Sequence, residues 1–148
     1  MKTIMITLAL VLTAGSAAPV MAADAIYTSW KNNLAVGGYD TVSFFSGKPQ
    51  IGKKDLSFDY AGAEWRFATR GNLDLFKTNP EAFMPQYGGY CAWAVAQDKL
   101  AKGSPDHWHV EDGKLYLNFN ARIKRRWDKD ISGYITSAEG NWPDILKD

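Results

Sequence analysis

One cysteine and two histidines are the side chains of this sequence that could hold a soft or borderline metal ion. Cys91 is the only cysteine of the 148 residues, and His107 and His109 are the only histidines. Thiolate sulfur favours Cu(I), whereas imidazole nitrogen binds copper in either oxidation state and also Zn²⁺. The two histidines lie two positions apart on an expected strand, so both would point to one face. The sequence therefore predicts a metal site of Cys91, His107 and His109, provided that the fold brings their donor atoms within about 4 Å of one another.

Each of these residues also has a simpler interpretation. Cys91 is expected near the start of a helix, where backbone N–H groups and the helix dipole would stabilise a thiolate and make it a ligand or a reactive group. It could equally be a small buried apolar residue, as free cysteines often are. The histidines could lie on a solvated face opposite Trp108 and Val110. A redox role is weakened because no second cysteine is present to resolve an oxidised Cys91.

No recognised catalytic arrangement accompanies these residues. The sequence contains no apparent Ser/His/Asp set, no glycine-rich phosphate loop after a strand and no His-Glu-x-x-His motif. The basic run 124–126 is followed at once by Asp128 and Asp130, which is typical of a solvated helix face. We therefore expect a protein that is not an enzyme.

Two β-hairpins are expected to position the candidates. Apolar and polar residues alternate over 56–60 and again over 64–68, which predicts two strands of a hairpin. A second hairpin is predicted over 106–118, because its Asp112-Gly113 pair favours a tight turn. His107 and His109 would stand on the first strand of this second hairpin.

Short helices are expected between and after the hairpins. Asp40 is a suitable N-cap for a short helix, and Thr69 or Asn72 would cap another. Gly88-Gly89 is expected to open a helix over 90–99 that is apolar on nearly every face and so belongs in the middle of the domain. A basic amphipathic helix should follow Asn118.

The predicted fold is a single α+β domain, in which small antiparallel hairpins pack with four or five short helices around an aromatic core. Six Trp, seven Tyr and seven Phe residues supply that core. The aromatic residues on the apolar phase of their elements are expected to be buried: Trp65, Phe67, Phe76, Trp93, Tyr116 and Trp127.

The first 22 residues have the pattern of a secretory signal peptide. Lys2 supplies a positive start, an apolar run follows, and Val20-Met21-Ala22 forms a small-residue cleavage site. Residues 23–148 would then form the domain, located in the periplasm or secreted, with no stable membrane insertion after cleavage. Without Lys2 the domain has 16 basic and 16 acidic residues, which argues against general attraction to nucleic acid or an anionic membrane.

Three stretches of the sequence resemble the YHS domain family, in particular its secreted stand-alone bacterial members. The matching residues span nearly all of 23–148. They are Gly38-Tyr39-Asp40-Thr41-Val42, then Phe58-x-Tyr60-x-Gly62-x-x-Trp65-x-Phe67 continuing to Tyr87-Gly88-Gly89-Tyr90-Cys91-Ala92, and finally Asp112-Gly113-Lys114-Leu115-Tyr116-Leu117-Asn118. Of these, the motif of Tyr87, Gly88, Gly89 and Tyr90 ahead of Cys91 is the most specific.

The resemblance implies a binding or accessory role. YHS domains accompany copper-transporting ATPases and some multicomponent hydroxylases, and they are suspected of binding heavy metals through two cysteines. Those cysteines correspond to Ala68 and Asn72 here, neither of which is a soft-metal ligand. Any copper site would therefore have to use Cys91, His107 and His109.

We accordingly expect a periplasmic YHS-type binding or accessory protein that handles a transition metal, with a copper ion as the candidate cofactor. The alternative is a structural or protein-interaction module without a metal, acting on a protein partner. A reactive-thiol protein is a further alternative.

Overall fold

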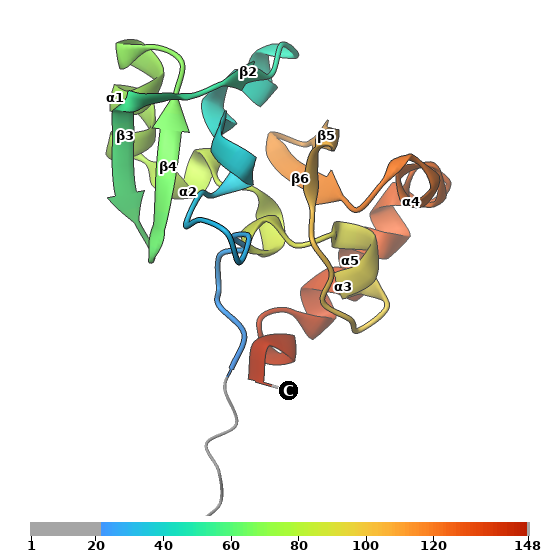
Figure 1. Ribbon diagram of the computed structural model, residues 1–148. Helices are drawn as coiled ribbons and strands as arrows, with labels where there is room; N and C mark the ends of the chain where they lie inside the picture. Colours follow the sequence, from blue (N-terminus) through green and yellow to red (C-terminus); the bar gives the residue numbers. More distant parts are fainter. Residues whose placement is uncertain (1–21, 148) are drawn as a thin grey trace, which may run out of the picture.

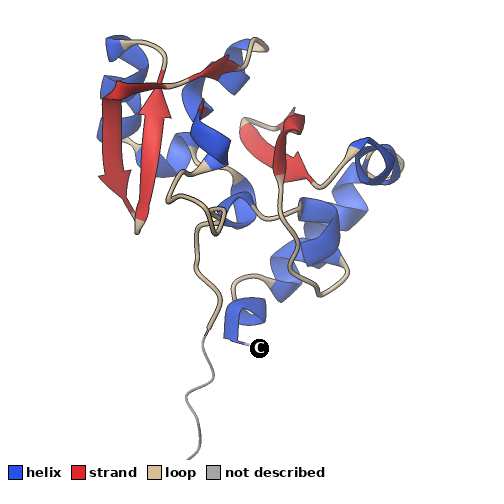
Figure 2. Cartoon of the chain, viewed as in Figure 1, coloured by secondary structure: helices blue, strands red, loops and turns tan. Residues whose placement is uncertain are grey.

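A computed structural model describes residues 22–147, and in this range three antiparallel hairpins combine with five α-helices. The strand pairs are β1 (Tyr39–Asp40) with β2 (Gln50–Ile51), β3 (Lys53–Tyr60) with β4 (Ala63–Phe67), and β5 (Ser104–Glu111) with β6 (Lys114–Asn118). The helices are α1 (Arg70–Thr78), α2 (Pro80–Phe83), α3 (Ala92–Ala96), α4 (Ala121–Trp127) and α5 (Ile131–Asn141). Short 3-10 helices cover Val36–Gly38, Thr41–Ser46, Gln86–Gly89 and Asp144–Lys147. The predicted single α+β domain is thus confirmed (Figures 1 and 2).

Both predicted hairpins are present. In the first, Phe58 of β3 pairs with Trp65 of β4, and the β4 residues alternate between buried and half-buried as a strand over a core should. In the second, Asp112 and Gly113 take φ values of 49° and 71°. Two successive positive φ angles are what a tight two-residue hairpin turn requires, which explains the Asp-Gly pair.

The second hairpin is irregular at its open end. Ser104 of β5 pairs with Asn118 of β6, whereas Trp108 pairs with Leu117, so the register shifts between these two positions. Four steps along β5 therefore match one step along β6. Such a bulge breaks the strict alternation of side chains along the strand. His107 lies inside this irregular stretch.

The helices begin where polar side chains cap them. Thr69 Oγ1 accepts a hydrogen bond of 3.1 Å from Asn72 N at the start of α1, so Thr69 is the cap. The basic helix expected after Asn118 is α4, which ends at Trp127, and a separate last helix, α5, follows it. Asp130 accepts a bond from Gly133 N of 3.1 Å and starts α5, which is why the helix does not run on.

Two aromatic cores share the strand β6. Trp65, Phe67 and Phe76 lie in the core beside the first hairpin, and Tyr116 and Trp127 lie in the core beside α3 and α5. These five side chains are buried as predicted. Trp93 was expected to be buried as well, but it is only partly buried and forms a wall of the pocket described below. Its helix, α3, spans five residues rather than the whole of 90–99, and only Ala92, Ala94 and Val95 of these five are buried.

The N-terminal arm runs back across the molecule to the C-terminal segment. Tyr27 N donates to Gly88 O at 2.9 Å, and Ala23 N donates to Leu146 O at 2.9 Å, which places the start of the arm beside the last 3-10 helix (Figure 1). The predicted signal peptide lies almost wholly outside the described residues. Within residues 22–147, no helix has the length and apolar character needed to cross a bilayer.

Candidate binding site at Cys91

Cys91 lies between β6 and a loop that follows α3. It forms a parallel bridge with Leu117, its N donates to Ala101 O at 2.8 Å, and its side chain is only 1 % exposed. The thiol Sγ lies 3.7 Å from Asn118 Oδ1, which also accepts a bond from Trp93 N at 3.2 Å. The buried amide of Asn118 thus fixes both the thiol and the start of α3.

The thiol is held in its protonated form. Burial raises the pKa of Cys91, and backbone N–H groups of Ala94, Phe119 and Trp93 act in the opposite direction without overcoming it. The expected stabilisation of a thiolate by a helix start is therefore the weaker effect. The helix begins at Ala92, one residue beyond Cys91, and is only five residues long.

The two histidines lie on the other side of β6 from Cys91. Leu117 of β6 bridges to Cys91 on one side and pairs with Trp108 of β5 on the other. Adjacent strands are about 4.8 Å apart, so the Cys91 backbone and β5 are separated by about two such spacings. His109 Nε2 instead lies 2.5 Å from Glu111 Oε2.

The structure consequently does not bring the three predicted ligands into one group. Within residues 22–147, no three or more His, Cys, Asp or Glu side chains gather closely enough to hold a metal ion. The prediction that His107 and His109 share a face depended on regular alternation along the strand, and His107 lies in the stretch of β5 where the register with β6 shifts. The donors that are present do not fit a three-ligand copper site.

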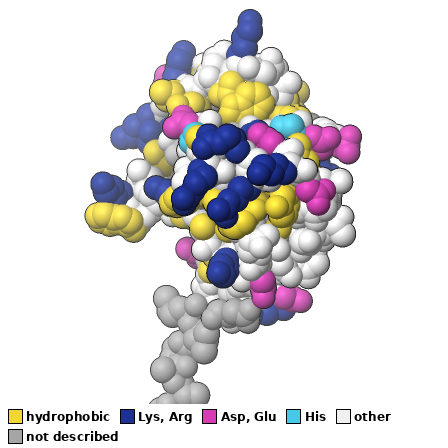
Figure 3. Space-filling view, turned by 90° about the vertical axis from the view of Figure 1, so that its right-hand side faces the viewer, with side chains coloured by type: hydrophobic (Ala, Val, Ile, Leu, Met, Phe, Trp, Pro, Cys, Tyr) yellow, Lys and Arg dark blue, Asp and Glu magenta, His cyan; other side chains and the backbone are white. Residues whose placement is uncertain are grey.

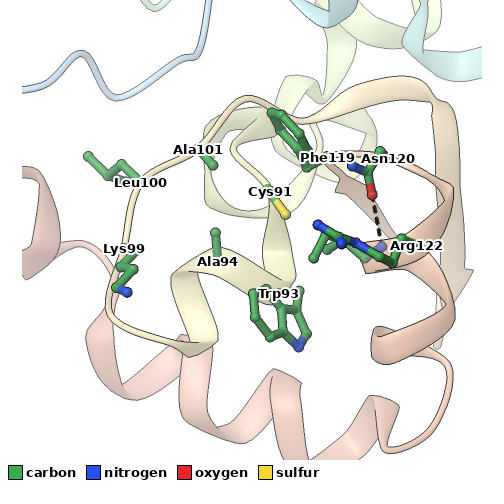
Figure 4. Close-up of a pocket in the computed structure, with 10 residues that line it drawn as sticks. Cys91, Trp93, Ala94, Lys99, Leu100, Ala101, Phe119, Asn120 and Arg122 are labelled. Carbon is green, nitrogen blue, oxygen red and sulfur yellow. Dashed lines mark hydrogen bonds between the residues drawn. The ribbon is translucent and has the colours of Figure 1, made fainter.

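A pocket of about 310 Å³ opens beside the thiol. It is bounded by α3, the loop after α3, the segment after β6, and α4 (Figure 4). Its walls are mainly apolar, and Figure 4 shows the Cys91 side chain directed into the space between them. The apolar lining comes chiefly from Trp93, Ala94, Leu100, Ala101, Phe119 and Ile123.

Basic side chains stand around this pocket. Lys102 Nζ lies 5.4 Å from the ring centroid of Phe119, and Arg126 Cζ lies 5.4 Å from that of Trp93. Arg122 is exposed and lines the pocket from the start of α4 (Figure 4). Figure 3 shows Lys and Arg side chains gathered over apolar surface on one face of the molecule. The site thus combines an apolar interior with a cationic rim.

Ala68 and Asn72 both contact Asp40. Asp40 is fully buried, and its Oδ2 accepts bonds from Ala68 N at 2.9 Å and Asn72 Nδ2 at 2.7 Å. Its Oδ1 accepts from Val42 N at 3.0 Å and from Ser43 N at 3.3 Å. Asp40 is therefore the predicted N-cap, of the 3-10 helix Thr41–Ser46, and it also links this helix to the start of α1.

The Tyr87-to-Tyr90 motif forms the seat of the N-terminal arm. Gly88 and Gly89 adopt φ values of 61° and 87°, in a 3-10 turn rather than at the opening of a helix. A Cβ on Gly88 would lie 1.8 Å from Ala25 O, so only glycine allows the arm to approach. Tyr90 Oη donates to Asp24 O at 2.8 Å, which ties the arm to the residue before Cys91.

Sequence reasoning missed most of the pocket. Of its lining residues, Cys91 and Trp93 were singled out from the sequence, whereas Lys99 and Arg122 carried no motif, and the basic run was noted only for residues 124–126. The four-residue spacing of Phe119, Ile123 and Trp127 in the sequence is a further signal, because it places Ile123 on an inward face. Nothing in the sequence pairs the loop after α3 with the start of α4.

No family model, curated protein or solved structure matches this chain. The similarity to YHS domains therefore rests on the motif residues alone, and the function is argued from the geometry of the pocket.

Proposed function

We propose that this chain is a non-catalytic binding or accessory module of the YHS type that acts in the periplasm or outside the cell. Its binding site is the pocket beside Cys91. One observation carries the proposal: a concave, mainly apolar pocket of about 310 Å³ next to the chain's only thiol. Small-molecule sites are typically such pockets, from about 300 Å³ upward, with a few polar groups among apolar walls.

A role in copper handling is the less favoured candidate. Cu(I) would need soft donors around Cys91, and the histidines stand beyond β6, one of them next to Glu111. A single buried thiol with a raised pKa is poorly suited to bind a metal ion, because the thiolate is the form that acts as a ligand. The two candidates therefore make opposite predictions for Cys91.

The pocket is tested with naphthalene-2-carboxamide, a flat neutral probe, by titration calorimetry on the chain from Ala23. We expect measurable binding that is lost in Ala101→Phe, because the new ring would occupy the pocket. Ala82→Phe adds the same ring at an exposed position of α2 and should bind as the unmodified chain does. Equal binding by all three proteins, or by none, would overturn the proposal.

The copper alternative is tested by titrating Cu(I) against a competing chelator. Under our proposal the unmodified chain and Cys91→Ser take up equal, weak amounts, since the thiol is not a ligand. A circular dichroism melt of each protein shows that both are folded during the titration. Strong uptake by the unmodified chain alone would favour the metal site instead.

A further inference from the structure

The rim of the Cys91 pocket carries four cationic side chains that form no ion pair with a carboxylate of residues 22–147. Lys99 and Arg122 line the pocket, and Lys102 and Arg126 lie over two of its aromatic walls. In the part of the chain that the structure describes, the ion pairs involve four other cationic groups, on Arg66, His109, Lys124 and Lys147. Since residues 23–148 are formally neutral, this concentration of cations belongs to the pocket and is not a general property of the chain.

From this arrangement we infer that the pocket takes a small molecule with a flat apolar body and an anionic group, such as an aromatic carboxylate. This inference rests on the proposed function and names its ligand class. The rings of Trp93 and Phe119, with Ile123 and Leu100, offer apolar contact to the body. The Arg122 guanidinium presents paired N–H donors that match a carboxylate, and the Lys99 ammonium adds a second positive charge.

The chemistry of the walls explains why both parts of the ligand are needed. An anion inside an apolar pocket is strongly disfavoured unless a cation or hydrogen-bond donor pairs with it. The cations stand at the rim, so the charged group lies there while the apolar body fills the interior beside Cys91. A pocket of about 310 Å³ encloses a small molecule and offers no extended track for a nucleic acid strand.

The test compares two probes of nearly the same shape, naphthalene-2-carboxylate and naphthalene-2-carboxamide. On the unmodified chain from Ala23, we expect the carboxylate to bind at least about tenfold more tightly, which corresponds to about 1.4 kcal/mol. In the variants Arg122→Gln and Lys99→Gln, this preference for the carboxylate over the carboxamide should shrink. Arg70→Gln removes an exposed cation of α1, a helix that does not line the pocket, and should leave the preference for the carboxylate unchanged.

Each outcome decides between the two proposals. Equal affinity for both probes would leave the pocket's role intact and overturn the anionic ligand class. A preference that survives in the double variant Arg122→Gln, Lys99→Gln would also overturn it, because the rim would not be its source. If neither probe binds the unmodified chain, the proposed function and this inference fall together.

Discussion

Replacing Gly88 with alanine tests whether the glycine motif exists to seat the N-terminal arm. The new Cβ would lie 1.8 Å from Ala25 O, so the arm must move away. The arm would then lose the Tyr27-to-Gly88 hydrogen bond and the burial of Ile26, which is 6 % exposed. A hydrogen bond contributes about 1 kcal/mol and a buried isoleucine about 1.5–3 kcal/mol, while the positive φ adds about 1 kcal/mol. We therefore expect Gly88→Ala to lower the free energy of unfolding by about 4 kcal/mol.

Gly113 provides the matched control for this experiment. It has a φ of 71°, close to the 61° of Gly88, but nothing lies within 4 Å of its added Cβ. Gly113→Ala should therefore cost only the backbone strain, about 1 kcal/mol. Urea unfolding of both variants measures the difference. If both variants lose the same free energy of unfolding, the reasoning is refuted. It is also refuted if Gly88→Ala still loses more than Gly113→Ala after residues 23–27 are deleted, because no arm would then remain to be displaced.

Two further changes probe buried polar groups. Asp40→Asn replaces a carboxylate oxygen that accepts two N–H bonds with an NH₂ group that can only donate. Urea unfolding should therefore show that the free energy of unfolding falls by about 3 kcal/mol. An unchanged urea midpoint would show that the hydrogen bonds of Asp40 are dispensable. Burial raises the pKa of Tyr116 from 10.0 to about 12, so the folded chain keeps a proton that the unfolded chain releases. The stability due to this group is thus complete below pH 10.0 and is lost as the pH rises toward about 12. Tyr116→Phe should flatten that decline in an alkaline series of thermal melts, and an identical slope would contradict the assignment.

Much of the fold was predictable because its signals are local. The Asp112-Gly113 turn follows from the φ angles that two neighbouring residues must adopt, and the burial of Trp65 and Phe67 follows from alternation within one strand. Asp40 was predicted as a cap for the same reason, and so was Thr69, with Asn72 as the alternative. Each of these predictions depends on a few adjacent residues.

The site was less predictable because it depends on contacts between distant segments. The register shift between Ser104 and Trp108 reflects how β5 meets β6, and nothing in the sequence of β5 alone indicates it. The pKa of Cys91 is set by what covers it, not by the helix that follows it. Arg122 becomes a pocket residue only because α4 packs across the end of α3.

The strand β6 makes the two cores interdependent. Leu115 and Leu117 belong to the core of the first hairpin, whereas Tyr116, between them, belongs to the core of α3 and α5. Because a strand's side chains alternate between its faces, melting either core would remove a wall of the other. The two halves should therefore unfold together in a single cooperative transition, despite having separate hydrophobic interiors. The Cys91 pocket, fixed to the end of β6 through Asn118, would keep its shape until that transition.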